Sequence, residues 1–184
     1  MSGPGLLMWA KVLIWHILIF RSPSTVCLDD KYLLYKLRHF GIQGKLLPWI
    51  DAFLTDRSFN VKIEGALSAA AQVISGAPQG SVLGPLLFLV YTADLNFSTN
   101  SHFAKYADDF KIYNESCNQL SMTNDISAVL KWSEQWGLPL NRDKCSILHL
   151  GSKNCKHTYC MRGAELKKSE SYLDLGLLVT SNLS

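Results

Sequence analysis

Residues 103–113 read FAKYADDFKIY, with two adjacent aspartates among apolar and aromatic residues. Strand-favouring residues flank Asp108 and Asp109, so we predict two short strands around a tight acidic turn. Two adjacent carboxylates in an apolar setting are costly to bury unpaired, and a divalent cation with a preference for hard oxygen ligands removes that cost. The alternative is a solvated Asp-Asp turn, because Asp favours turns, and for an isolated pair that interpretation is the better one.

A second stretch, SGAPQGSVLGP over residues 75–85, precedes the acidic turn. Its glycines allow unusual dihedral angles and a close approach of the backbone to a nucleotide. Gln79 can donate and accept hydrogen bonds at a base or sugar edge. The alternative is a plain strand-to-helix loop with Ser81 as the helix cap. The apolar run 86–91 that follows predicts a buried helix.

Periodicity extends this pattern to both sides of the two stretches. Apolar residues at helical spacing predict helices over 31–40, with Asp30 as the N-cap, over 45–54, and from 124 or 125 to 136. Apolar or alternating runs predict strands over 59–63, 72–75, 145–150 and 173–180, the first two joined by a turn at Glu64-Gly65. Helices and strands mixed in this order predict an α+β fold, an antiparallel sheet backed by helices.

The length and composition of the chain limit the class of protein to which it can belong. The 184 residues suffice for one domain or a large part of one, and 48% hydrophobic residues favour a packed core over disorder. Only 18% are charged, which is low for a complete soluble domain. The net charge of +3 permits contact with phosphates but is too small for a dedicated basic nucleic-acid module.

The spacing of the five cysteines does not indicate a disulfide framework. Their irregular spacing and odd number predict free thiols in a reducing compartment; the residues are Cys27, Cys117, Cys145, Cys155 and Cys160. Cys155, His157 and Cys160 resemble part of a zinc site, but a fourth ligand is not evident.

The N-terminal run Leu6–Phe20 is strongly apolar, with Lys11 and His16 inside it. It is shorter than the ~18–20 residues of a spanning helix, and a charge near its centre opposes insertion. A buried strand or a buried helix is the favoured interpretation, and membrane association of residues 6–20 is the lesser alternative. Pro23 marks a break after it.

Taken together, SGAPQGSVLGPLLFLVYTADL and FAKYADDFKIY resemble the reverse transcriptases of non-LTR retrotransposons, or long interspersed elements. The resemblance continues in KYLLYKLRHFGIQGKLLPWIDAFLTDR upstream and in WSEQWGLPLNRDKCSILHLGSKN and LDLGLLVTSNLS downstream, and covers about Lys31 to Ser184. It implies a partial right-hand polymerase palm, with fingers and thumb incomplete or absent. We therefore expect residues 1–24 to be a hydrophobic segment outside the family and residues 25–184 to be a palm fragment.

The resemblance also implies roles for particular residues. Asp108 and Asp109 match the catalytic, metal-binding pair, which would hold Mg²⁺ or Mn²⁺ weakly here. Lys144 matches a candidate proton donor to pyrophosphate, although a solvated turn lysine explains it equally well. The residues that match nucleotide- or template-binding positions are Ser75, Gly76, Pro78, Gln79, Gly80 and Tyr106. The implied partners are an RNA template, a DNA primer and deoxynucleoside triphosphates, inside the cell in the nucleus or cytoplasm, with no specific protein partner.

One part of the family's site is missing from the sequence. The resemblance implies a further aspartate on an upstream strand, and its expected place falls on Ser24 or Val26, neither of which is a carboxylate. Asp29 and Asp30 are the nearest acids, and the start of a helix explains both. We therefore predict a reverse transcriptase fragment that is catalytically impaired. The alternative is a non-catalytic remnant of the palm that binds nucleic acid or protein.

Overall fold

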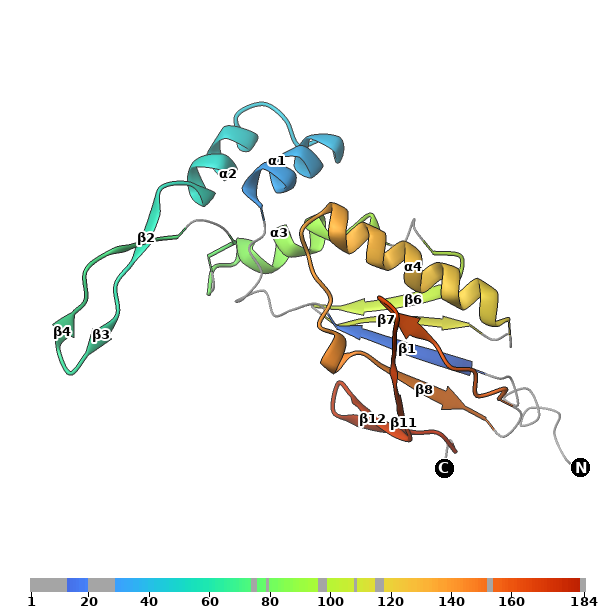
Figure 1. The fold of residues 1–184 in the computed structure, drawn as a ribbon. Coiled ribbons are helices and arrows are strands. Elements are labelled where there is room, and N and C mark those ends of the chain that lie inside the picture. The colour runs from blue at the N-terminus through green and yellow to red at the C-terminus, as the bar shows by residue number, and fades with distance from the viewer. Residues whose placement is uncertain are drawn as a thin grey trace, which may run out of the picture. The chain divides into compact units, whose positions relative to one another are not determined.

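The computed structural model describes residues 13–19, 29–73, 76–78, 80–95, 99–107, 109–114, 118–151 and 154–182. The chain forms two compact units. Unit 1 combines Met1–Phe20, Leu95–Glu134 and Pro139–Ser184, and unit 2 combines Arg21–Asp94 and Gln135–Leu138. Figure 1 shows the helices and strands of both, and the predicted α+β class is confirmed.

Unit 1 is built on a five-stranded sheet in the order β11-β8-β1-β7-β6 (Figure 1). Its strands are β1 (Leu13–Ile19), β6 (His102–Tyr106), β7 (Asp109–Asn114), β8 (Ser146–Leu150) and β11 (Lys167–Ser169). Every neighbouring pair is antiparallel except β11 and β8, which are parallel. Of the two interpretations of the N-terminal run, the strand is correct for 13–19, and this strand occupies the centre of the sheet.

Helix α4 (Gln119–Gln135) belongs to the same unit. It begins earlier than predicted because Asn118, rather than Asn124 or Asp125, supplies the side chain at its start: Asn118 Oδ1 accepts from the amide of Ser121 at 3.2 Å. Asp125 instead lies buried inside the helix and accepts from the amides of Asn100 and Ser101 before β6, at 2.9 and 3.0 Å. The buried stripe of α4 has helical spacing and consists of Met122, Ile126, Val129 and Trp132.

The predicted strand 173–180 is in fact a hairpin. Strand β12 (Ser171–Asp174) pairs with β13 (Leu177–Thr180) around Leu175 and Gly176, whose φ angles are 48° and 87°. Two consecutive positive φ angles suit the tight turns that join twisted antiparallel strands. The alternation of the sequence identified the strand conformation but not the reversal in its middle. A shorter hairpin, β9 (Cys160–Met161) with β10 (Ala164–Glu165), precedes it.

Unit 2 contains α1 (Asp30–His39), α2 (Leu46–Leu54) and α3 (Leu83–Tyr91), and α1 packs against both other helices. The predicted N-cap is wrong by one residue. Asp29, not Asp30, caps α1, because its Oδ1 accepts from the amides of Lys31 and Tyr32 at 2.8 and 3.4 Å. Leu33 and Leu37 of α1 are buried.

A two-stranded ribbon follows α2 (Figure 1). Strand β2 (Arg57–Phe59) pairs with β5 (Ala71–Val73), and β3 (Lys62–Ile63) pairs with β4 (Ala66–Leu67). The predicted turn at Glu64-Gly65 is confirmed, with φ angles of 48° and 89°. Phe59, Ile63 and Leu67 on the ribbon are all exposed.

The next observations concern the cysteine thiols and the possibility of a membrane-spanning helix. Cys145 and Cys160 are free thiols, as expected, but Cys155 is disulfide-bonded, so the expectation of free thiols is wrong for that residue. Within the described ranges, no helix is long and apolar enough to cross a membrane.

Candidate functional site

The acidic turn is the hairpin between β6 and β7. Tyr106 and Asp109 are cross-strand partners, so only Ala107 and Asp108 form the loop. Ala107 has a φ of 50°, the positive value that such two-residue loops require. Asp109 is half-buried, whereas Tyr106 is exposed. The predicted tight turn is confirmed, and Asp108 itself lies outside the described residues.

The strand next to the acidic turn is β1. Its register places Ile19 opposite Asp109 and Leu18 opposite Phe110. Residues opposite each other in an antiparallel pair have Cβ atoms ~5 Å apart on one face of the sheet, so the end of β1 is where a neighbouring strand would add a carboxylate to this turn. The sequence of β1, LIWHILI, contains none. Ser24 and Val26, the positions expected for the missing aspartate, lie outside the described residues, and the strand that pairs with β7 ends before them.

Two lysines of unit 1 differ in their surroundings. Lys144, the candidate proton donor, is exposed in the short 3-10 helix η2 (Arg142–Lys144) just before β8. Lys111 on β7 is buried and forms an ion pair with Asp174 at the end of β12. Alternation along β7 places Lys111 on the same face as Asp109. This ion pair could not be predicted from the sequence, because its two members lie far apart along the chain.

The glycine-containing loop belongs to unit 2. Gly76 and Gly80 have φ angles of 87° and 78°, values that side chains rarely adopt, so the expectation of unusual backbone geometry is confirmed for both. Pro78 lies between them, and its carbonyl accepts from Ser81 Oγ at 2.7 Å. Ser81 Oγ in turn accepts from the amide of Gly84 at 3.0 Å, so Ser81 caps the start of α3, as its alternative interpretation required. Ser75 and Gln79 lie outside the described residues.

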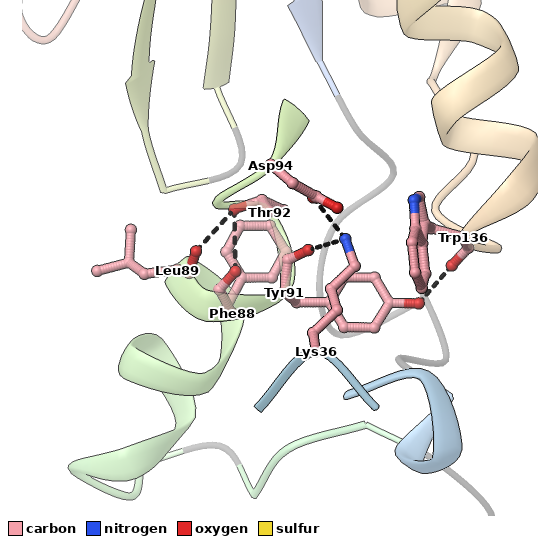
Figure 2. Close-up of polar contacts among 7 residues, drawn as sticks. All are labelled: Lys36, Phe88, Leu89, Tyr91, Thr92, Asp94 and Trp136. Atoms are coloured by element: carbon pink, nitrogen blue, oxygen red, sulfur yellow. Dashed lines mark hydrogen bonds and ion pairs between the residues drawn. The ribbon is translucent and has the colours of Figure 1, made fainter. Parts of the chain in front are cut away.

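The two ends of the segment formed by this loop and α3 are held by basic side chains. At the loop, Arg57 donates through Nη2 to the carbonyl of Gly76 and through Nε to that of Leu54 at 2.6 Å. At the far end of α3, Lys36 donates to the carbonyl of Tyr91 and to Asp94 Oδ1, both at 2.6 Å (Figure 2). Neither residue was singled out from the sequence, where Lys36 reads as one polar position on an amphipathic helix.

The ligand chemistry of the acidic turn suits a hard cation only in part. Carboxylate oxygens are what Mg²⁺ prefers, and the turn offers those of Asp109 and, by sequence, of Asp108. No three His, Cys, Asp or Glu side chains are grouped as metal ligands among the described residues, which do not include Asp108. The partial zinc pattern is likewise not assembled there, since Cys155 is engaged in a disulfide.

Comparison with known protein families identifies the family to which the chain belongs. Residues 29–177 match the family described as reverse transcriptase (RNA-dependent DNA polymerase). The chain belongs to the reverse transcriptase family. The match includes the acidic turn, the glycine-containing loop and Lys144, and it leaves β1 outside, so the predicted boundary between residues 24 and 25 stays a prediction.

Curated relatives of this reverse transcriptase domain come from mobile elements. The chain is 28% identical over 166 residues to the RNA-directed DNA polymerase from mobile element jockey of Drosophila melanogaster, a match that covers 83% of the chain and 18% of the relative. It is 34% identical over 141 residues to the probable RNA-directed DNA polymerase from transposon BS of the same organism, covering 66% of the chain and 16% of the relative. The chain therefore spans less than a fifth of the length of these relatives.

Solved structures agree on the fold. The apo telomerase from Candida tropicalis, truncated from its C-terminal domain, matches with a TM-score of 0.60 and 14% identity over 85% of the chain and 34% of the telomerase. Telomerase from Candida albicans in complex with a TWJ fragment of telomeric RNA matches with a TM-score of 0.56 and 14% identity, over 83% of the chain and 29% of that structure. This reverse transcriptase chain thus has the palm fold of a polymerase.

The structure brings only some of the predicted site residues together. Tyr106 and Asp109 are neighbours across one hairpin, and Gly76, Pro78 and Gly80 share one loop. The hairpin and Lys144 belong to unit 1, while the loop belongs to unit 2. The residues that the sequence did not reveal are those that hold these segments in place, namely Arg57, Lys36 and Lys111.

Proposed function

We propose that this chain is the palm segment of a retrotransposon reverse transcriptase that holds a primer, an RNA template and a deoxynucleoside triphosphate but extends the primer poorly or not at all. The family match and the mobile-element relatives support the reaction class. Nucleic-acid substrates of this kind are found in the nucleus and the cytoplasm, where the chain would act. The observation that carries the impairment is the pairing of the acidic turn with a strand that has no carboxylate.

The proposed chemistry is attack of a primer 3′-hydroxyl on the α-phosphate of the incoming nucleotide. Asp108 and Asp109 would hold Mg²⁺ or Mn²⁺, which supplies stabilisation of the charge that develops on the phosphoryl oxygens. Lys144 would donate a proton to the leaving pyrophosphate. The loop residues Gly76, Pro78 and Gly80, together with Ser75 and Gln79, would shape the nucleotide pocket, and the exposed Tyr106 ring would contact the template or primer end.

The weakness of this site follows from the number of its ligands. Two carboxylates on one turn leave most of the coordination of a bound ion to water, so the ion is held loosely. A catalytic ion needs fixed geometry, because removing one preorganised group that stabilises the transition state typically costs ~10²–10³ in rate. Loss of an anchoring ligand should cost at least as much. Asp29, one of the two acids that could substitute, is already engaged as the cap of α1.

Restoration of a carboxylate at the end of β1 tests the proposal. Purified wild-type chain is incubated with a DNA primer on an RNA template, Mn²⁺ and deoxynucleoside triphosphates. We expect no extension above that of an Asp108→Asn, Asp109→Asn double variant. Ile19→Asp and Phe20→Asp, made one at a time because Ile19 pairs with Asp109 and Phe20 follows it, should raise extension.

The same substitutions in the double Asn background are the matched control, since they add the new carboxylate without the acidic pair. Extension that appears only when the pair is intact supports the proposal. Template-dependent extension by the wild type above the double variant would contradict the impairment. Direct binding of Mn²⁺, followed by its relaxation effect on water protons, should be weak and should weaken further in Asp109→Asn.

A further inference from the structure

The glycine-containing loop and α3 form one continuous element in unit 2. The carbonyl of Pro78 accepts from the amide and the hydroxyl of Ser81, and the hydroxyl accepts from the amide of Gly84. A Cβ atom on Gly84 would lie 2.9 Å from the Pro78 oxygen, a distance that real Cβ atoms essentially never show. The loop is therefore folded tightly against the first turn of α3, and a movement of the helix carries the loop with it.

Arg57 fixes the loop end of this element. Its guanidinium donates to the carbonyl of Gly76 and, through Nε, to the carbonyl of Leu54 at the end of α2. Arginine presents several donors in a rigid planar fork, so a single side chain can join two carbonyl groups from different segments. Arg57 thereby ties the entrance of the loop to the last turn of α2.

Lys36 fixes the opposite end. The Lys36 side chain is 3% exposed. Its ammonium is bonded to the Tyr91 carbonyl and to Asp94, and it lies 3.8 Å from the centre of the Trp136 ring (Figure 2). The C-terminal end of a helix carries a partial negative charge on its free carbonyls, which a cation stabilises. Neighbouring carbonyls are satisfied locally, since Thr92 Oγ1 donates to Phe88 at 2.9 Å. Lys36 therefore serves as a cap of α3 that is supplied by α1.

We propose that Lys36 and Arg57 are positioning residues that set the glycine-containing loop for the incoming nucleotide. Each holds one end of the loop–α3 element through backbone carbonyls, and both come from segments that precede the loop in the chain. Neither is a catalytic residue, because each acts only through the element it holds. The inference rests on the proposed role of the loop in nucleotide binding.

Hydrogen–deuterium exchange measures the positioning directly. In Arg57→Lys, a point-like ammonium replaces the fork and cannot join both carbonyls in the same way. We expect amides over residues 80–84 to exchange about tenfold faster, while the amides inside α1 stay unchanged, since local opening reports on local contacts. Asp94→Asn keeps the size of the Lys36 partner but removes its charge, and it should speed exchange in the same residues from the far end of α3.

Lys31→Met is the matched control, because Lys31 is exposed on the same helix as Lys36 and its substitution should leave the loop unchanged. Faster exchange through all of unit 2 in both variants would overturn the proposal, since it would show only a general loss of stability. Unchanged exchange at 80–84 in both variants would overturn it as well.

A second measurement separates the positioning from the nucleotide. Binding of thymidine triphosphate with Mg²⁺ is followed by titration calorimetry in the wild type and in both variants, and we expect weaker binding in Arg57→Lys and Asp94→Asn. Absence of binding by the wild type would overturn the proposed role of the loop while leaving the exchange result in place. Equal binding by all three proteins, with faster loop exchange in the variants, would overturn the link between loop position and nucleotide.

Discussion

The loop–α3 element of unit 2 and the acidic turn of unit 1 differ in what completes them. In unit 2 the buried ammonium of Lys36 and the guanidinium of Arg57 bond to carbonyls and a carboxylate of the protein itself. In unit 1 the acidic turn is paired with a strand that contributes no carboxylate to it. The loop–α3 element is thus held by side chains of its own unit, whereas the acidic turn receives no carboxylate from the strand that pairs with it.

The largest effect is expected from removal of the buried cation. Lys36→Met removes the ammonium that bonds to the Tyr91 carbonyl and to Asp94, and breaking a buried ion pair in this way typically costs ~3–5 kcal/mol. We expect unit 2 to lose about that much stability in urea unfolding followed by Trp fluorescence. Lys31→Met, the same substitution at an exposed position of α1, should change the midpoint little. Equal losses in the two variants would remove the special role of Lys36.

A smaller loss is expected at the start of α3. Gly84→Ala places a Cβ atom 2.9 Å from the backbone oxygen of Pro78, so the loop or the helix must shift. Overpacking of this kind costs ~1–3 kcal/mol. Gly44→Ala is the control, because Gly44 has a positive φ of 68° but open space around it, which separates the steric cost from backbone strain. Thermal unfolding that ranks Gly44→Ala as the more damaging change would contradict this account.

Unit 1 should respond to acid through His149 on β8. Burial lowers the pKa of the His149 imidazole from its ordinary value of 6.5, against an opposing effect of the Asn154 side chain. Because the folded state disfavours the protonated ring, its contribution to stability is complete above pH 6.5 and is lost as the pH falls below that value, at up to about 1.4 kcal/mol per pH unit. His149→Gln should flatten this acid limb in unfolding experiments between pH 7 and pH 5. His102→Gln, at an exposed position of the same unit, should leave the limb in place.

The smallest effect is expected on the ribbon. Ile63 on β3 is 67% exposed, and surface substitutions away from special features usually change stability by about 0.5 kcal/mol or less. Ile63→Thr keeps β-branching and should leave both the unfolding midpoint and the exchange of residues 80–84 unchanged. A clear loss of stability would mean that the ribbon also supports the loop–α3 element.

Short-range chemistry explains what the sequence could predict. The acidic turn, the Glu64-Gly65 turn and the helix after the loop each depend on residues that are neighbours in the chain, and all three are confirmed. The reversal at Leu175-Gly176 was missed because the apolar run continues through it. The family resemblance rested on the same local blocks and is likewise confirmed.

Long-range partners explain what the sequence could not predict. Nothing in the sequence around Lys36 reveals that Tyr91, Asp94 and Trp136 converge on its ammonium. The apolar Phe40 of the same segment is exposed, whereas the charged Lys36 is buried. The register of β1 against β7 is also set by tertiary structure. It indicates the end of β1 at Ile19, rather than Ser24 or Val26, as the place for a carboxylate next to the acidic turn. The roles proposed for Asp108, Asp109, Lys144 and the loop residues stay predictions.

The central place of β1 has a consequence for how the molecule is made. Leu13 at the start of β1 pairs with Leu150 at the end of β8, so the sheet cannot close until β8 has left the ribosome. Before that moment the edge of β1 that pairs with β8 stays open, and open edges pair readily with other chains. Contacts this distant along the chain also slow folding. Synthesis of this sheet therefore passes through an interval of aggregation risk, and trimming the N-terminal residues would make that interval permanent.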